Sequence, residues 1–235
     1  MKKTLLAIAA VFAVSVSTAF ANVEMDLNYY MKPVRNFTVD NSVITTDYSV
    51  PSFFGLEDSF SFFFGKNASM FDAGLGFGFG FDVFSNPETS TMGYSKTTLE
   101  AAGFDMFLRI GPVFRFTFGK AFSLSATPGL TTNIFLLIPK NSSNSANQEI
   151  GFGANVSFFT ELAAKLWFVN SESGGFHFGL NAGALCEWNI AGSYSFASST
   201  SSGDAAGRSS PVKNGFDLKF FVGLAFNFGS RGVDR

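Results

Sequence analysis

Apolar and polar residues alternate one by one along most of the chain after its first 21 residues. The clearest case lies between residues 72 and 83, where Ala, Leu, Phe and Val at odd positions alternate with Gly and Asp at even positions. Successive side chains of a β-strand point to opposite faces of the sheet, so this pattern predicts a strand with one apolar face. Similar segments predict eight strands, over residues 23–31, 60–64, 72–83, 104–118, 122–138, 150–168, 176–196 and 216–228, with the start of the second left open.

The connections between these strands are alternately short and long. Short links are predicted at residues 65–69, 119–120 and 170–175, and long polar links at 32–59, 85–102, 139–148 and 197–214. Bacterial outer-membrane barrels join their strands in this way, with short periplasmic turns and longer external loops. Because the strand count is even, both ends of the barrel domain are expected on the periplasmic side.

The composition favours a surface that faces lipid. The chain has 33 Phe and 24 Gly in 235 residues, and only 14% of its residues are charged, against about 25% in soluble domains. No run of 18 apolar residues follows the first 21, so a helical span is not predicted. A soluble lipocalin-like barrel or sandwich is the alternative, but an eight-stranded interior is too narrow to hold this many Phe and Leu side chains. The predicted fold is therefore an all-β, eight-stranded antiparallel up-and-down transmembrane barrel, with its apolar face toward the lipid.

The N-terminus has the features of a signal for Sec export. Lys2 and Lys3 precede an apolar run, which ends at the small-residue site Ala19-Phe20-Ala21. This pattern predicts a signal peptide over residues 1–21, cleaved near Ala21, and a barrel domain over residues 22–235 in the cell outer membrane. Cys186 is the only cysteine. Neither a lipoprotein anchor nor an intramolecular disulfide is predicted, and Cys186 is interpreted as a packing thiol.

From Asn22 to Phe228 the pattern resembles the small eight-stranded outer-membrane barrels of the OmpA/OmpX/OmpW-like superfamily. The last strand is similar to the C-terminal signal that such proteins present to the barrel assembly machinery, namely Gly223 followed by Phe226 and Phe228. Here residues 229–235 follow, whereas family members often end on the final aromatic residue. The Phe-rich, Gly-alternating style also resembles spirochaete outer-membrane proteins. Resemblance to the OmpW-like members implies passage of small hydrophobic compounds through the interior and out through the wall.

The phase of the alternation assigns an inward face to each strand. Ionisable residues of both signs and a row of glycines are expected there. These candidate lumen residues are Glu24, Asp26, Asp72, Gly74, Gly76, Gly78, Gly80, Asp82, Arg109, Arg115, Glu161, Lys165, His177, Glu187, Asp217 and Lys219. Two interpretations stay open: a salt-bridged core that plugs a narrow barrel, or a narrow lining that passes a small solute. The four glycines leave space that bulky inward residues such as Phe107 or Phe159 could fill.

Other functions receive little support from the residues. The formal net charge is −2, and −4 over residues 22–235, which have 14 basic and 18 acidic residues, so no nucleic-acid partner is expected. His177 is the only histidine, and Gly179 stands where a deacylase-like pattern would have a serine. No catalytic residue, cofactor or metal is predicted. The expected function is a structural or surface-interaction barrel in outer-membrane lipid, whose loops could bind a host or surface ligand. The alternative is a narrow OmpW-like channel.

Overall fold

The computed structural model describes residues 22–40, 45–64, 70–91, 96–119, 121–139, 149–170, 176–198 and 209–229. The predicted signal peptide, the link at 140–148 and residues 230–235 lie outside these ranges. None of the described residues forms a helix long and apolar enough to cross a membrane.

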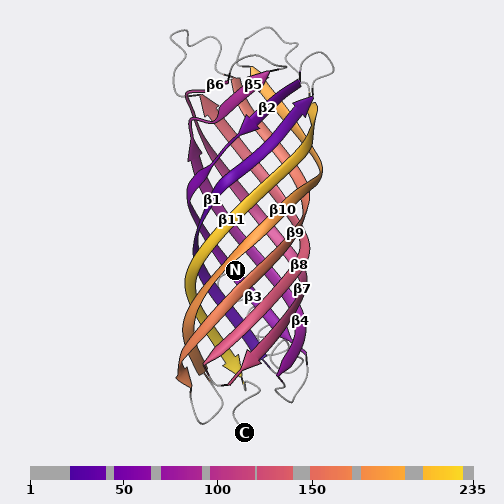
Figure 1. The fold of residues 1–235 in the computed structure, drawn as a ribbon. Coiled ribbons are helices and arrows are strands. Elements are labelled where there is room, and N and C mark those ends of the chain that lie inside the picture. The colour runs from indigo at the N-terminus through magenta and orange to yellow at the C-terminus, as the bar shows by residue number, and fades with distance from the viewer. Residues whose placement is uncertain are drawn as a thin grey trace, which may run out of the picture.

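Eight long antiparallel strands form a closed ring. The neighbours around the ring are β1, β3, β4, β7, β8, β9, β10 and β11, and β11 pairs with β1 to close it. Three short strands, β2, β5 and β6, extend one edge beyond β1 (Figure 1). The strand bounds are β1 Asn22–Asp40, β2 Thr45–Ser49, β3 Ser52–Phe63, β4 Phe71–Ser85, β5 Glu88–Thr91, β6 Thr97–Thr98, β7 Ala101–Phe118, β8 Phe122–Pro139, β9 Glu149–Asn170, β10 Phe176–Ser198 and β11 Ser209–Gly229. The predicted all-β, eight-stranded barrel is confirmed.

The register of the strands sets their tilt. Following hydrogen-bonded partners from Asn22 around the ring leads back to β1 at the bulge between Met31 and Val34, about ten residues from the start. A barrel of eight strands with this stagger has strands inclined by about 40° to its axis. Figure 1 shows that the strands are tilted against the barrel axis, with β1 beginning and β11 ending at the lower end. We call this the short-turn end, and the end near β2, β5 and β6 the long-loop end.

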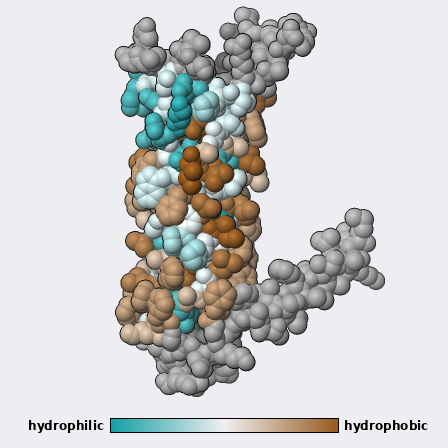
Figure 2. All heavy atoms as spheres, turned by 90° about the vertical axis from the view of Figure 1, so that its right-hand side faces the viewer, coloured by the Kyte–Doolittle hydropathy of each residue, from teal (hydrophilic) through white to brown (hydrophobic). Residues whose placement is uncertain are grey.

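The outer wall is apolar over most of its height. Large hydrophobic side chains that would be buried in a soluble protein are exposed here, such as Leu108 and Leu162 with more than 60% of their surface accessible. Figure 2 shows apolar residues over the middle and lower parts of one face and hydrophilic residues toward the long-loop end. Every ring strand except β1 carries an outward Phe within two residues of its short-turn end, as in the aromatic girdles of membrane barrels: Phe64, Phe71, Phe118, Phe122, Phe168, Phe176 and Phe228.

The strands extend further toward the long-loop end than the alternation predicted. Much of the predicted links at 32–59, 85–102 and 197–214 is strand, because β1 continues to Asp40, β3 begins at Ser52 and β11 begins at Ser209. In this region the polarity of the two faces reverses: Phe37 and Val39 point inward, whereas Asn36 is exposed. Above the lipid the outer face meets water, so the apolar residues of β1 belong on the inside. The alternation with apolar residues on the outer face therefore ends before the strands end, which is why the strands were predicted too short.

Candidate functional site

The interior nearest the short-turn end holds a buried ion cluster, which we call the lower ion cluster. Arg115 of β7 is 1% exposed; its Nη1 pairs with Glu24 and its Nη2 lies 2.6 Å from Asp72. Its guanidinium lies 3.9 Å from the centre of the Phe63 ring. Lys165 of β9 completes the cluster, because its Nζ lies 2.7 Å from carboxylate oxygens of Glu24 and Asp26. Glu24 therefore joins the two cations across the lumen.

A second group, the middle ion cluster, lies above the first. Arg109 of β7 pairs with Glu57 and with Glu161, the latter at 2.7 Å. Lys219 of β11 also pairs with Glu57. The ammonium group of Lys219 lies over two aromatic rings, 3.9 Å from the centre of Tyr30 and 4.5 Å from that of Phe107. Rings and carboxylates thus surround both cations, as buried charges require.

The upper ion cluster contains two cations from β1 and three carboxylates. Lys32 Nζ lies 2.9 Å from both Asp82 and Asp105, and Arg35 lies 3.0 Å from Asp105. Asp217 is more distant, at 3.8 Å from Lys32 and 3.6 Å from Arg35. The five side chains come from β1, β4, β7 and β11, so the cluster connects strands on different sides of the ring.

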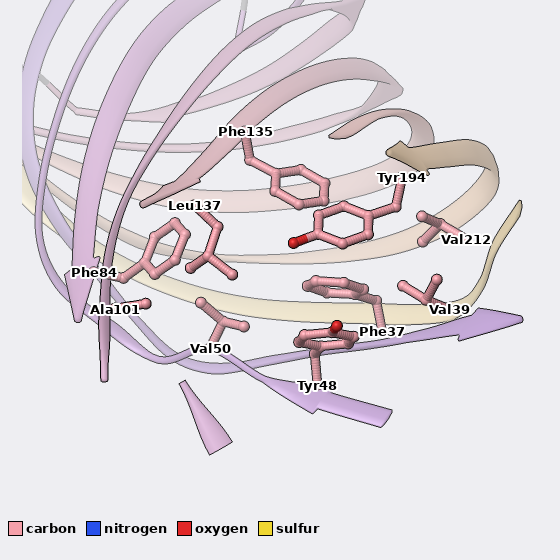
Figure 3. Close-up of a cluster of buried hydrophobic side chains, with 10 residues drawn as sticks. All are labelled: Phe37, Val39, Tyr48, Val50, Phe84, Ala101, Phe135, Leu137, Tyr194 and Val212. Atoms are coloured by element: carbon pink, nitrogen blue, oxygen red, sulfur yellow. The ribbon is translucent and has the colours of Figure 1, made fainter. Parts of the chain in front are cut away.

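Buried hydrophobic side chains gather inside the barrel next to Arg35 of the upper ion cluster, and we call them the aromatic cap (Figure 3). The Phe37 ring stacks on Tyr48 of β2 at 5.0 Å, and the Phe135 ring stacks on Tyr194 at 5.4 Å. Burial raises the pKa of Tyr48 to about 12, so its hydroxyl stays neutral at a pH where an exposed tyrosine would begin to ionise. The cap consists of Phe37, Val39, Tyr48, Val50, Phe84, Ala101, Phe135, Leu137, Tyr194 and Val212.

Two small cavities lie among these layers of described side chains. A cavity of about 30 Å³ lies beside Gly76 and Gly78, between the lower and middle ion clusters, and one of about 10 Å³ lies beside Arg35. A site needs roughly 10–15 Å³ of this kind to hold one water molecule. The larger cavity therefore accommodates about two waters.

The four inward glycines of β4 have different surroundings. A Cβ on Gly74 would collide with the backbone of Phe62, and one on Gly80 would collide with the backbone of Leu56 and the ring of Phe107. A Cβ on Gly76 would meet its nearest atoms at 3.5 Å. Close neighbours therefore occupy the space beside Gly74 and Gly80, and at Gly80 one of them is the Phe107 ring, which the sequence named as a side chain that could fill it.

The remaining predicted lumen residues also point inward. His177 is fully buried near the short-turn end, where its ring and that of Trp167 form a T-shaped pair with centres 6.5 Å apart. Glu187 accepts a hydrogen bond of 2.5 Å from Asn133. In the last strand Gly223 lies against Asn28 in the lumen, whereas Phe226 and Phe228 lie on the outer face and contact Phe176.

Sequence reasoning missed four charged residues of the clusters: Lys32, Arg35, Glu57 and Asp105. Lys32 continues the inward series of Glu24, Asp26 and Asn28, and Asp105 is in phase with Arg109, so the alternation could have found both. Among the described residues, the inward carboxyl groups outnumber the inward cations. The carboxyl groups are Glu24, Asp26, Glu57, Asp72, Asp82, Asp105, Glu161, Glu187 and Asp217, and the cations are Lys32, Arg35, Arg109, Arg115, Lys165 and Lys219.

Comparison with solved structures identifies the fold. The outer membrane protein OprG from Pseudomonas aeruginosa matches with a TM-score of 0.54 and 11% identity, over 90% of this chain and 98% of that one. The outer membrane protease OmpT from Escherichia coli matches with a TM-score of 0.52 and 7% identity, over 88% and 95%. Ail, the attachment invasion locus protein of Yersinia pestis, matches at 0.42 and 10%, over 89% and 99%. No protein-family model and no curated protein matches the chain.

The fold and the apolar wall together define the class: this is an outer-membrane β-barrel protein with the architecture of the small outer-membrane barrels, as the resemblance implied. The likeness to spirochaete proteins stays a prediction. A protease is among the proteins with this fold, so the fold itself does not decide whether the chain is an enzyme. Within the described ranges, no three His, Cys, Asp or Glu side chains are grouped so that they could hold a metal ion.

Proposed function

We propose that this protein is a structural or surface-interaction barrel whose polar lumen is plugged. The observation that carries the proposal is the stacking of three ion clusters beneath an aromatic cap, with small cavities of about 30 Å³ and 10 Å³ beside them. A buried charge without a partner is costly, so these side chains stabilise one another in a fixed arrangement. A side chain that left its cluster to open a path would leave its partners uncompensated.

The rival function is a narrow channel for small hydrophobic solutes, and the cavity beside Gly76 and Gly78 is where such a path would pass. Uptake of a hydrophobic solute into proteoliposomes tests both functions. The plugged barrel should give no uptake above protein-free vesicles. Uptake by the wild type that the Gly76→Leu and Gly78→Leu variants abolish would establish the channel, provided that both variants retain heat-dependent mobility on gels.

We further propose that the long-loop end faces the outside of the cell and meets a host or surface ligand there. The polar outer faces of β1 and β2 support this orientation, for example Thr38 and Asp47, which share a hydrogen bond of 2.7 Å. In a Cys186→Ser background, cysteine at Thr89 should react with a membrane-impermeant maleimide on intact cells. Cysteine at Gly119, at the short-turn end, should not. Labelling of the Gly119→Cys variant in place of the Thr89→Cys variant would show that the orientation is the opposite of the one proposed.

Export and assembly are also proposed from the sequence. Cleavage after Ala21 would leave Asn22, the first residue of β1, which pairs with Phe63 and Gly229. N-terminal sequencing of the protein from outer membranes should begin at Asn22. The pattern of Gly223, Phe226 and Phe228 would be read by the barrel assembly machinery, and Phe228→Ala should slow insertion in cells more than refolding into pure lipid.

A further inference from the structure

One carboxyl group points away from the lumen, toward the lipid. On β3, Glu57 pairs with lumen cations, and Ser59 lines the lumen cavity, so Asp58 between them points outward. Its partners in the register are Leu27 on β1 and Phe79 on β4, and both are exposed apolar side chains of the outer wall. Asp58 is thus an isolated ionisable group in an apolar surface.

Asp58 lies deep within the apolar band of the wall. It is five residues from Phe63, the last residue of β3, and Phe64 of the aromatic girdle follows directly. Phe64 is six residues from Asp58, so with about 3.3 Å per residue and an inclination of about 40°, Asp58 is about 15 Å above that girdle. The apolar band of a membrane barrel is about 25 Å tall, so this carboxyl group is close to the middle of the bilayer.

A groove surrounds Asp58 on the outer wall. It has a volume of about 500 Å³, in the size range of small-molecule sites, and its surface is almost entirely apolar. Leu27, Tyr29, Leu56, Phe79, Phe81 and Met106 border it. The Oδ1 atom of Asp58 has no hydrogen-bond partner among the described residues. That atom is buried against the wall, whereas Oδ2 of this half-buried residue is not buried and also has no hydrogen bond or ion pair with a described residue. Hydrocarbon offers no water to bind, so a molecule that enters from the lipid would meet the carboxyl group at Oδ2.

We propose that this groove binds a hydrophobic amine that arrives through the membrane. The apolar body of the amine would occupy the groove, and its ammonium group would form an ion pair with the Asp58 carboxylate. An amine fits better than an alcohol because opposite charges attract strongly where the dielectric constant is low. It fits better than an acid, whose carboxylate would repel that of Asp58. Ionisable residues at membrane depth usually mark functional sites. The site lies outside the plugged lumen and does not depend on an open channel.

Methyl NMR of the full barrel in lipid nanodiscs tests the proposal, with 1-aminoadamantane and 1-adamantanol as probes of nearly equal shape. The amine should shift the methyl signals of Leu27, Leu56 and Met106 saturably, with an affinity at least tenfold above that of the alcohol. Leu162 and Leu166 on β9 lie across the ring from β3 and report simple partitioning of the amine into the lipid. Their methyl signals should not show the saturable shift seen at the groove. Equal shifts at both sites, or equal affinities for amine and alcohol, would overturn the proposal.

Two variants separate the carboxylate from the shape of the groove. Asp58→Asn keeps the volume and hydrogen-bonding capacity but removes the charge, and should reduce amine affinity at least tenfold while changing alcohol affinity little. Thr132→Val, an outward substitution on β8, is the matched control and should bind the amine as the wild type does. An Asp58→Asn barrel with wild-type amine affinity would contradict the assignment of Asp58. The comparison of the two probes on the wild type decides the proposal even if a variant does not fold.

Discussion

Replacing Arg115 by methionine tests whether the ion clusters are dehydrated. The substitution keeps much of the side-chain volume but removes the cation that pairs with Glu24 and Asp72. Arg115 and Glu24 are each 1% exposed. Two unit charges about 3 Å apart interact by about 5 kcal/mol at an effective dielectric constant near 20. Removing one partner of a buried pair costs about 3–5 kcal/mol in measured cases. Glu24 keeps Lys165 at 2.7 Å, so we expect a loss near the lower limit, about 3 kcal/mol.

The free energy of unfolding can be measured by urea titration in phospholipid vesicles, with Trp167 and Trp188 as fluorescent reporters. Lys213→Met is the control, because Lys213 pairs with Asp40 at 2.8 Å but is 55% exposed. Exposed pairs contribute about 0.2–1 kcal/mol. Adding Asp72→Asn to Arg115→Met should recover part of the loss, since it removes one uncompensated carboxylate. If Arg115→Met lost less than about 1 kcal/mol, like the control, the lumen would be hydrated and the reasoning refuted.

Three further predictions have defined outcomes. Gly74→Ala should destabilise the barrel by about 1–3 kcal/mol because the new methyl group would collide with the backbone. Gly76→Ala, which has more space around it, should change stability by less than about 0.5 kcal/mol. Urea titration compares the two variants, and equal losses of stability would contradict the difference in space. Asp58→Leu should raise stability by about 1–2 kcal/mol because it removes a polar group from the lipid face, and a loss would show that Asp58 has a structural role. The folded protein holds the hydroxyl of Tyr48 neutral, with a pKa of about 12 against about 10 in the unfolded chain. The free energy of unfolding should therefore be unaffected by this group below pH 10 and should fall by up to about 2–3 kcal/mol as the pH rises from 10 to 12. Tyr48→Phe should remove that part of the pH dependence, and identical pH profiles for both proteins would contradict the burial of the hydroxyl.

The part of the fold within the membrane could be predicted from the sequence because its physical rule is local. Lipid requires an apolar residue at every second position, so strands such as β4 are visible without any tertiary information. Lys32 and Asp105 are in phase with that alternation, whereas Arg35 and Glu57 were missed because the regularity is interrupted. The bulge between Met31 and Val34 shifts the phase before Arg35, and β3 was recognised only from Phe60 onward, which left out Glu57.

The aromatic cap could not be predicted in the same way. Phe37 and Tyr48 belong to the predicted link of 32–59, and they meet Phe135 and Tyr194 from distant strands only after the ring has closed. In this region the apolar residues point inward, whereas in the membrane segment they point outward. The height at which this reversal occurs depends on the tilt of the whole barrel. Whether the space beside a glycine is occupied also depends on other strands: the Phe107 ring of β7 occupies the space beside Gly80, whereas the space beside Gly76 stays open.

Single-channel recording in planar lipid bilayers tests the central claim most directly, namely that the three ion clusters and the aromatic cap close the lumen. Purified, folded protein should give no discrete conductance steps above the baseline of protein-free bilayers at any applied voltage that the membrane withstands. Reproducible small steps from the folded wild-type protein, absent in a heat-unfolded control, would contradict the claim and show a water-filled path through the clusters.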